Sequence, residues 1–317
     1  MGQSGNGLNG PGLGDEIMKR LLIAVKRTKW ERDLLRFGSD KDALRIYEIQ
    51  NHAYQRVHSS HERQMKNLEA LRRALPEASY AYREDLPGLN RENFDYIASF
   101  GGDNHFVYVS HFTSGHPILG INSDPETSHG ALLYFTIESL LEKLKQKNAE
   151  FVTEPWTRVD CDLEFADGRR FRTGPCTSEI SLRSAFPESV SRYHIRKSGQ
   201  PWEEHKSSGL LLASGAGSTG WFRNCHPASL RRGTTFEKDA PFFRIVAREY
   251  GQGSRRLLYR HASINAGEAL EVISEMDGEI NIDCHPERTY EFPPACRALF
   301  FMSPEPLRVV RDICPKK

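Results

Sequence analysis

Short apolar runs and helical periodicity alternate along the first half of the chain. Residues 20–25 read Arg-Leu-Leu-Ile-Ala-Val, a continuous apolar run typical of a buried strand. After a long polar segment, residues 60–75 carry Met and Leu at helical spacing and predict a helix, which Ser59 and Glu62 would open as a capping box. Three further strands and another helix are expected, at 79–82, 96–100, 117–121 and 136–147. Strands that alternate with helices predict a parallel α/β sheet.

The pattern changes after about residue 150 to short strands in which apolar and polar residues alternate. Residues 157–165 alternate in this way and lead to Asp167-Gly168, a dipeptide typical of a two-residue hairpin turn. Further short strands are expected at 169–173, 179–182, 192–196, 210–214, 263–265, 269–274 and 279–283. This pattern predicts a mostly-β domain with a sandwich-like architecture.

The expected fold class is therefore α/β plus β. A Rossmann-like α/β domain is predicted over residues 19–150, and residues 298–317 are expected to return to complete it. The mostly-β domain is predicted over residues 151–297. Residues 1–18 are rich in glycine and are predicted to form a disordered arm.

The expected strand at 96–100 ends abruptly in Gly101-Gly102-Asp103-Asn104. Glycines at such a point let the backbone approach a phosphate group closely, because no Cβ stands in the way. The carboxylate would then lie where it can meet a sugar hydroxyl or a magnesium ion. Gly-Gly-Asp is also ordinary turn chemistry, so this loop alone leaves both interpretations open.

A second segment, residues 206–221, repeats the pattern of an apolar strand that enters a loop of small residues. From Ser214 to Gly220 no side chain is larger than that of Thr219, so up to seven backbone amides could line an anion site. The alternative is a tight turn packed beneath Trp221. Two such loops, each after a strand, favour a phosphate-binding cradle over two coincidental turns.

The order of these motifs resembles the NAD kinase family, in particular its branch of mitochondrial NAD kinases and plant NADH kinases. The resemblance covers the chain from about Arg20 to about Asp283. It rests on Lys26-Arg27-Thr28, Gly101-Gly102-Asp103, Pro117 to Pro125, Ser191-Arg192-Tyr193, Pro201-Trp202-Glu203, Lys206 to Leu210, Gly217-Ser218-Thr219 and Met276-Asp277-Gly278. It implies a first domain of the diacylglycerol/NAD kinase type.

The resemblance also implies a reaction. The γ-phosphoryl group of ATP would pass to the 2′-hydroxyl of the adenosine ribose of NAD or NADH, giving NADP or NADPH. Mg²⁺ would arrive with ATP and have no fixed protein ligands, and polyphosphate is an alternative donor. The expected assembly is a homodimer or homotetramer.

Phosphoryl transfer needs positioning, charge neutralisation and a group that orients the attacking hydroxyl. Asp103 is the candidate for that last role, and its alternative is an aspartate that caps the next helix. The candidate nucleotide- and NAD-binding residues are Gly101, Gly102, Asn104, Asn122, Asp124, Ser178, Glu179, Ser208, Ala216, Gly217, Ser218, Thr219 and Trp221. For Asn122 and Asp124 a simple Asx-turn is the alternative, and for Glu179 a solvent-facing strand position.

Several residues depart from the family pattern. Asn104 stands where the family has glycine, and His105 stands where it has threonine. Asn is the best substitute for a glycine of positive φ, because it tolerates left-handed geometry. Ser178 replaces the asparagine of an Asn-Glu pair, and Trp221 replaces a tyrosine while keeping an aromatic surface.

Composition narrows the classes of function. With 43 basic and 42 acidic residues the net charge is +1, so no global field recruits nucleic acid or a membrane surface. The mean hydropathy is −0.57, and no apolar run approaches the roughly 20 residues that span a bilayer. The six cysteines lack metal-ligand spacing, and the histidines near the first loop do not suit zinc. The N-terminal arm lacks the features of a secretory signal or a mitochondrial presequence, so a cytoplasmic protein is expected.

Two rival functions remain at this point. A lipid or sphingoid-base kinase shares the Gly-Gly-Asp loop, although Gly217-Ser218-Thr219 and Asn122 favour the NAD kinase interpretation. A dinucleotide-binding protein with weak or lost catalysis is suggested by Asn104, His105 and Ser178. The presence of Asp103 favours an active enzyme.

Overall fold

The computed structural model describes residues 20–51, 53–146, 151–226, 233–250 and 257–312. The chain forms two compact units. The first contains Met1–Thr153 together with Val309–Lys317, and the second contains Glu154–Arg308. The predicted arm, residues 1–18, lies outside the described residues.

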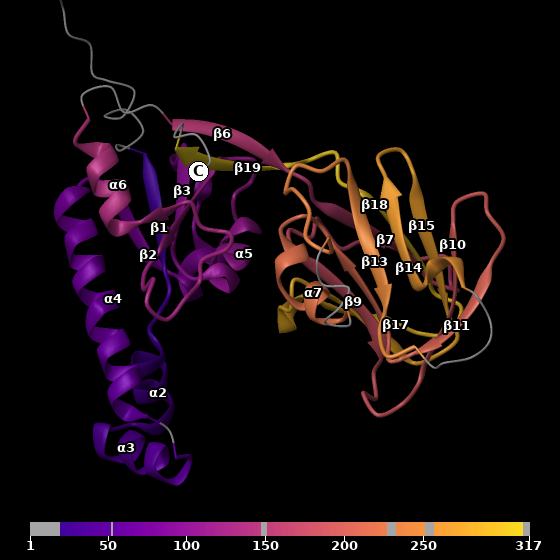
Figure 1. Cartoon of the computed structure of the whole chain (residues 1–317), viewed down its shortest axis with the longest axis horizontal. Helices are drawn as coiled ribbons and strands as arrows, with labels where there is room; N and C mark the ends of the chain where they lie inside the picture. Colours follow the sequence, from indigo (N-terminus) through magenta and orange to yellow (C-terminus); the bar gives the residue numbers. More distant parts are fainter. Residues whose placement is uncertain (1–19, 52, 147–150, 227–232, 251–256, 313–317) are drawn as a thin grey trace, which may run out of the picture. The chain divides into compact units, whose positions relative to one another are not determined.

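The first unit is built on a mainly parallel sheet with the strand order β2-β1-β3-β4-β19-β6 (Figure 1). Parallel pairing joins β1 to β2 and β3, and β4 to β3, β5 and β19, as expected for an α/β domain. Its strands are β1 (Leu21–Val25), β2 (Ser79–Tyr82), β3 (Tyr96–Gly101), β4 (Ile118–Asn122), β5 (Phe135–Thr136), β6 (Phe151–Trp156) and β19 (Leu307–Asp312).

Helices α4 (Tyr54–Ala74) and α6 (Ile137–Leu144) cover one face of this sheet, and α5 (Asp103–Ser110) lies on the other face (Figure 1). Leu71 of α4 and Leu140 of α6 join the sheet residues in one buried cluster. Two short 3₁₀ segments, η1 (Arg83–Gly88) and η2 (Arg91–Asn93), lead from β2 to β3. The central strands are buried throughout, which explains their continuous apolar runs.

The polar segment after β1 contains two helices that the apolar pattern did not predict, α2 (Lys29–Phe37) and α3 (Asp40–Ile49). With the start of α4 they enclose an aromatic cluster in which the rings of Trp30 and Tyr54 lie 5.5 Å apart. Because this packing continues α4 back to Tyr54, the capping box predicted at Ser59 and Glu62 is wrong. Capping boxes lie instead at Thr28 and Glu31, where α2 begins, and at Thr136 and Ser139, where α6 begins.

The second unit is a sandwich of two six-stranded sheets with antiparallel pairing. Their strand orders are β11-β10-β15-β18-β7-β8 and β14-β13-β12-β9-β16-β17. Side chains of both sheets, such as Leu270 and Leu212, meet in one buried core. The strands are β7 (Val159–Glu164), β8 (Arg170–Arg172), β9 (Glu179–Ser184), β10 (Ser191–Lys197), β11 (Glu203–Ser207), β12 (Leu210–Ala213), β13 (Phe242–Ala247), β14 (His261–Asn265), β15 (Ala269–Ser274), β16 (Gly278–Ile282), β17 (Thr289–Phe292) and β18 (Arg297–Met302).

Short helical segments complete this unit: η3 (Gly217–Thr219), α7 (Trp221–Asn224), η5 (Leu258–Arg260) and η6 (Pro286–Arg288). The return of the chain to the first unit differs from the expected 298–317. Strand β18 pairs with β15 and β7 inside the sandwich, and only β19 joins the parallel sheet beside β4. Both strands are apolar, so hydropathy alone did not separate them.

Candidate functional site

The protein's own packing requires a glycine at position 101 of the first loop and leaves limited room at Gly102. A Cβ on Gly101 would lie 2.6 Å from a ring carbon of His105, and one on Gly102 would lie 3.0 Å from the Ser128 hydroxyl. Gly102 is the N-cap of α5, so the loop passes directly into the helix. The loop therefore has little room for a larger residue, whether or not a phosphate lies against it.

The Asp103 carboxylate binds a neighbouring backbone segment. Its two oxygens accept N–H groups from Ala131, at 3.0 Å, and from Leu132, at 2.9 Å. Asp103 is the first residue of α5 and not its N-cap, so the capping alternative does not describe it. The carboxylate remains partly exposed, which leaves a face of it open to solvent.

Asn104 lies in the first turn of α5, is exposed and has no positive φ. The suggestion that it fills a left-handed position is therefore wrong, because α5 begins one residue earlier, at Asp103. His105 is fully buried, and its Nε2 donates to the carbonyl of Ala24 at 2.9 Å. Burial lowers the pKa of His105 to about 3, so the ring is neutral and anchors α5 to β1.

Asn122 is the last residue of β4, and Asp124 follows it at the same edge of the sheet. The Asn122 side chain accepts the N–H of Asp124 at 3.1 Å and donates to the Ser128 carbonyl at 3.0 Å, so the Asx-turn alternative is observed. Asp124 is buried and accepts hydrogen bonds from Arg63, at 2.9 Å, and Ser60, at 2.6 Å. Burial alone would raise the pKa of Asp124, but these hydrogen bonds outweigh it and lower the pKa.

In the second unit, residues 214–218 are buried. A Cβ on Gly217 would lie 2.2 Å from the carbonyl oxygen of Ser178, and one on Gly215 would lie 2.0 Å from that of Glu237. The backbone N–H groups of Ser214 and Ser218 already donate within the unit, as do those of Gly217 and Gly220. The suggestion that seven amides line an anion site is therefore wrong for these positions, since the chain itself occupies them.

Ser178 precedes β9 and Glu179 opens it, and both are held by a residue that the sequence motifs did not indicate as a site residue. The Asp283 carboxylate accepts backbone N–H groups from Thr177, Ser178 and Glu179 at 2.8, 2.6 and 3.0 Å. The Cys176 thiol donates to it as well, at 3.1 Å. Asp283 ends the stretch that resembles NAD kinases, which was the only signal of its importance.

The Glu179 side chain joins β9 to α7. Its Oε1 accepts the backbone N–H of Phe222 at 2.6 Å, behind the small-residue loop. Burial, reinforced by the charge of Asp283, raises the pKa of Glu179 to about 7 even though the Phe222 N–H opposes the shift. Glu179 is thus a buried carboxyl and not the solvent-facing strand residue of the alternative interpretation.

The raised pKa of Glu179 predicts a pH-dependent effect of Glu179→Gln. The Glu179 carboxyl keeps its proton up to about pH 7 in the folded protein, whereas it loses the proton at about pH 4.3 in the unfolded chain. The wild type therefore loses stability as the pH rises between these two values. Gln keeps the oxygen that accepts the Phe222 N–H and has no charge. The free energy of unfolding of the variant, relative to wild type, should therefore rise by up to about 3 kcal/mol from pH 4.5 to 8. Urea unfolding at both pH values measures this, and a pH-independent difference would contradict it.

The remaining candidates of this unit are less closely grouped. Thr219 is exposed, Ala216 is buried, and the Ser218 hydroxyl donates to the Gly215 carbonyl at 2.7 Å. The guanidinium of Arg248 lies 4.9 Å from the centre of the Trp221 ring and covers one side of it. Ser208 precedes β12 whereas the loop follows it, so the extended strand separates them by roughly 13 Å.

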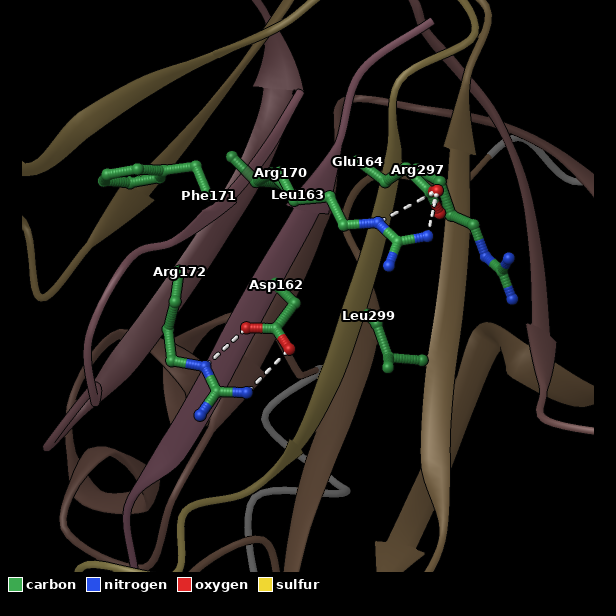
Figure 2. Close-up of a pocket in the computed structure, with 8 residues that line it drawn as sticks. All are labelled: Asp162, Leu163, Glu164, Arg170, Phe171, Arg172, Arg297 and Leu299. Carbon is green, nitrogen blue, oxygen red and sulfur yellow. Dashed lines mark hydrogen bonds and ion pairs between the residues drawn. The ribbon is translucent and has the colours of Figure 1, made fainter. Parts of the chain in front are cut away.

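A pocket of about 420 Å³ lies elsewhere, on the outer face of β7, β8 and β18 (Figure 2). Arg172 binds Asp162 through Nε and Nη2 at 2.6 and 2.8 Å, and Arg170 binds Glu164 at 2.8 Å. Arg170 and Arg172 are exposed, and each has a carboxylate partner; the third arginine of the pocket, Arg297, pairs with Glu271. The pocket therefore offers paired charges on a solvated sheet face and no concentrated positive charge.

Among residues 20–312, apart from the gaps given above, no group of three or more His, Cys, Asp and Glu side chains is arranged to hold a metal ion. No helix in the described part of the chain is both long and apolar enough to cross a membrane.

Comparison with solved structures identifies the fold as that of NAD kinases. An NAD kinase from Archaeoglobus fulgidus, solved with ATP, superposes with a TM-score of 0.59 at 19% identity over 92% of this chain and 94% of its own. Yeast NADH kinase, solved with NADH, gives a TM-score of 0.61 at 13% identity, with 96% of this chain and 84% of its own covered.

The sequence comparison agrees, and the predicted resemblance is confirmed. Mitochondrial NAD kinase 2 from Rattus norvegicus is 24% identical over 256 residues, which are 65% of this chain and 60% of the relative. The Homo sapiens protein of the same name is 22% identical over 253 residues, 65% of this chain and 57% of the relative. The match thus spans about three fifths of the length of these relatives. No family model matches the chain.

Proposed function

We propose that the protein transfers the γ-phosphoryl group of ATP to the 2′-hydroxyl of the adenosine ribose of NAD or NADH. The supporting observation is the β3–Gly101-Gly102-Asp103–α5 junction, which lies at the carboxyl edge of a parallel sheet in a fold shared with NAD kinases. Open α/β sheets bind ligands at this edge, and a partly exposed carboxylate is present there to orient a hydroxyl.

Asp103 and the residues around Glu179 have the main parts in this proposal. Asp103 orients the ribose hydroxyl and accepts its proton late in the transfer, while the bonds from Ala131 and Leu132 fix the carboxylate. Glu179 and Ser178, held by Asp283, form the dinucleotide-binding strand end with Thr219, Gly220 and Trp221.

Mg²⁺ is part of this proposal as a companion of ATP, whose phosphates bind the ion. When bound, it would neutralise charge on the phosphates. Polyphosphate remains an alternative donor. A cytoplasmic location and a homodimer or homotetramer complete the proposal.

The test is formation of NADP or NADPH by the whole chain, with NAD or NADH as acceptor and Mg-ATP or polyphosphate as donor. An NADP-specific dehydrogenase detects the product, and omission of each donor is the control. Product formation that requires both donor and acceptor supports the proposal. Its absence with every pair, although the dinucleotide binds, supports a binding protein with lost catalysis.

Two observations favour that second function. Residues 214–218 are closed by their own hydrogen bonds and packing, and Ser178 is shorter than the family's asparagine. Both features reduce the polar groups that could hold a substrate in position. The lipid kinase alternative needs a different readout: formation of ADP from Mg-ATP with a sphingoid base as the acceptor.

A further inference from the structure

Two cationic residues flank the first glycine loop at the ends of neighbouring strands. Val25 of β1 pairs with Tyr82 of β2 and with Phe100 of β3. The residues that follow these three are Lys26, Arg83 and Gly101, so they leave the carboxyl edge of the sheet side by side. The backbone N–H of Lys26 still donates to the Phe100 carbonyl, at 3.2 Å, which keeps Lys26 beside the loop.

Both cations are also tied to the helix that the loop opens. The guanidinium of Arg83 lies 3.7 Å from the centre of the Tyr108 ring on α5. The positive charges of Lys26 and Arg83 reach the buried His105, one turn into the same helix, and add to the lowering of its pKa. Arg32, in the first turns of α2, is the third member of this group, since its charge acts on Lys26.

Within the described residues no ion pair joins these three cations to a carboxylate, although the charge of Arg32 also acts on Asp33, whereas neighbouring cations do form such pairs. Lys29 lies 2.5 Å from Asp33, and Arg27 lies 3.8 Å from Glu84. Lys26 is half-buried, and burial followed by the charges of Arg32 and Arg83 lowers its pKa. A half-buried ammonium group beside like charges is unfavourable unless an anion compensates it.

We propose that Lys26 and Arg83, assisted by Arg32, bind the polyphosphate chain of the phosphoryl donor. This rests on the proposed function, and it assigns donor-binding residues that lie outside the two small-residue loops. A chain of several phosphates carries enough charge to compensate all three cations, which a single carboxylate would not. It would lie across the ends of β1 and β2, next to Gly101 and Gly102 and to the N-terminus of α5.

The experiment compares wild type with Lys26→Gln and Arg83→Gln. Inorganic tripolyphosphate and Mg-ATP serve as probes, and titration calorimetry at 50 and 300 mM salt measures their affinities. Each variant should bind both probes about tenfold more weakly and show a flatter salt dependence, since one cation is lost from the site. NAD affinity should change less than twofold. Lys29→Gln is the matched control, because Lys29 is nearby but paired with Asp33, and it should bind like wild type.

Thermal unfolding without any anion separates binding from a structural role. Removing the Lys26 charge relieves repulsion, so Lys26→Gln should melt at the same temperature as wild type or higher. A lower melting temperature together with unchanged tripolyphosphate affinity would make Lys26 a structural residue and overturn the proposal. Affinities within twofold of wild type in both variants would also overturn it.

The outcome is distinguishable from failure of the proposed reaction. If NADP forms but both variants keep the wild-type KM for ATP, the site is wrong and the reaction stands. If no NADP forms but the variants lose tripolyphosphate binding, the site stands and the reaction is wrong. Turnover distinguishes the two possible donors, since NADP forms either with ATP alone or with polyphosphate as well. In either case tripolyphosphate should compete with ATP for the same cations.

Discussion

Gly217→Ala is expected to lower the free energy of unfolding by roughly 3 kcal/mol, because the added methyl group has no space. Its Cβ would lie 2.2 Å from the carbonyl oxygen of Ser178 and 2.6 Å from Cγ of Glu179. The Ser178 carbonyl cannot move easily, since it accepts the Ser214 N–H at 3.0 Å. Asp283 fixes the backbone N–H groups of Ser178 and Glu179, so relieving the steric clash would require this whole backbone segment to shift.

Urea unfolding monitored by circular dichroism measures this loss. Gly88→Ala is the control, because a Cβ there meets nothing within 4 Å, and it should stay within about 0.5 kcal/mol of wild type. Gly215→Ala should resemble Gly217→Ala, since its Cβ would lie 2.0 Å from the Glu237 carbonyl. A Gly217→Ala protein as stable as the control would show that residues 214–220 are an adaptable loop. The closed packing described here would then be wrong.

The fold was predictable where burial is uniform. Strands β1, β3 and β4 are buried along almost their whole length, so they appear in the sequence as unbroken apolar runs. Helices α2 and α3 were missed because they bury mostly aromatic side chains, Trp30 and Tyr47, among many charged residues. That pattern lacks the aliphatic repeat by which α4 was recognised.

The candidate site was predictable in its motifs and not in its contacts. Gly101, Gly102 and Asp103 were identified from the end of a strand and the absence of side chains. The partners of Asp103 are backbone N–H groups of Ala131 and Leu132, and any residue type provides such groups. The role of Asp283 depends likewise on the pairing of β9 with β16, which places it beside a segment 104 to 107 residues away. A sequence pattern carries no signal for contacts of this kind.

The grouping of these cations could not be predicted from the sequence either. Lys26, Arg83 and Arg32 are separated along the chain, and the overall charge of +1 suggests a balanced surface. Only the parallel register of β1, β2 and β3 brings the first two to one edge. The charge of these side chains is therefore more positive than the near-neutral composition suggests, and this favours a polyphosphate ligand.

Asp103→Asn is expected to lower turnover in NADP formation by about 100-fold or more, with the dinucleotide affinity nearly unchanged. The substitution keeps one oxygen that accepts a backbone N–H and removes the charge that orients and receives the hydroxyl proton. The amide NH₂ would face the N–H of Ala131 or Leu132, so a loss of about 1–2 kcal/mol in stability should accompany the change. Stability and turnover thus have to be measured on the same preparation.

Separate measurements of kcat and of NAD affinity distinguish a catalytic role of Asp103 from a purely structural one. If the carboxylate serves the reaction, kcat falls while NAD still binds and the protein remains folded at the assay temperature. If it only fixes residues 131–132, lowering the assay temperature until the variant is as stable as wild type should restore turnover. Thr127→Ala is a matched control, since it removes a 2.7 Å hydrogen bond to Asp124 at the same sheet edge. Its turnover should stay within about threefold of wild type, because the lost bond lies away from the hydroxyl that Asp103 would orient.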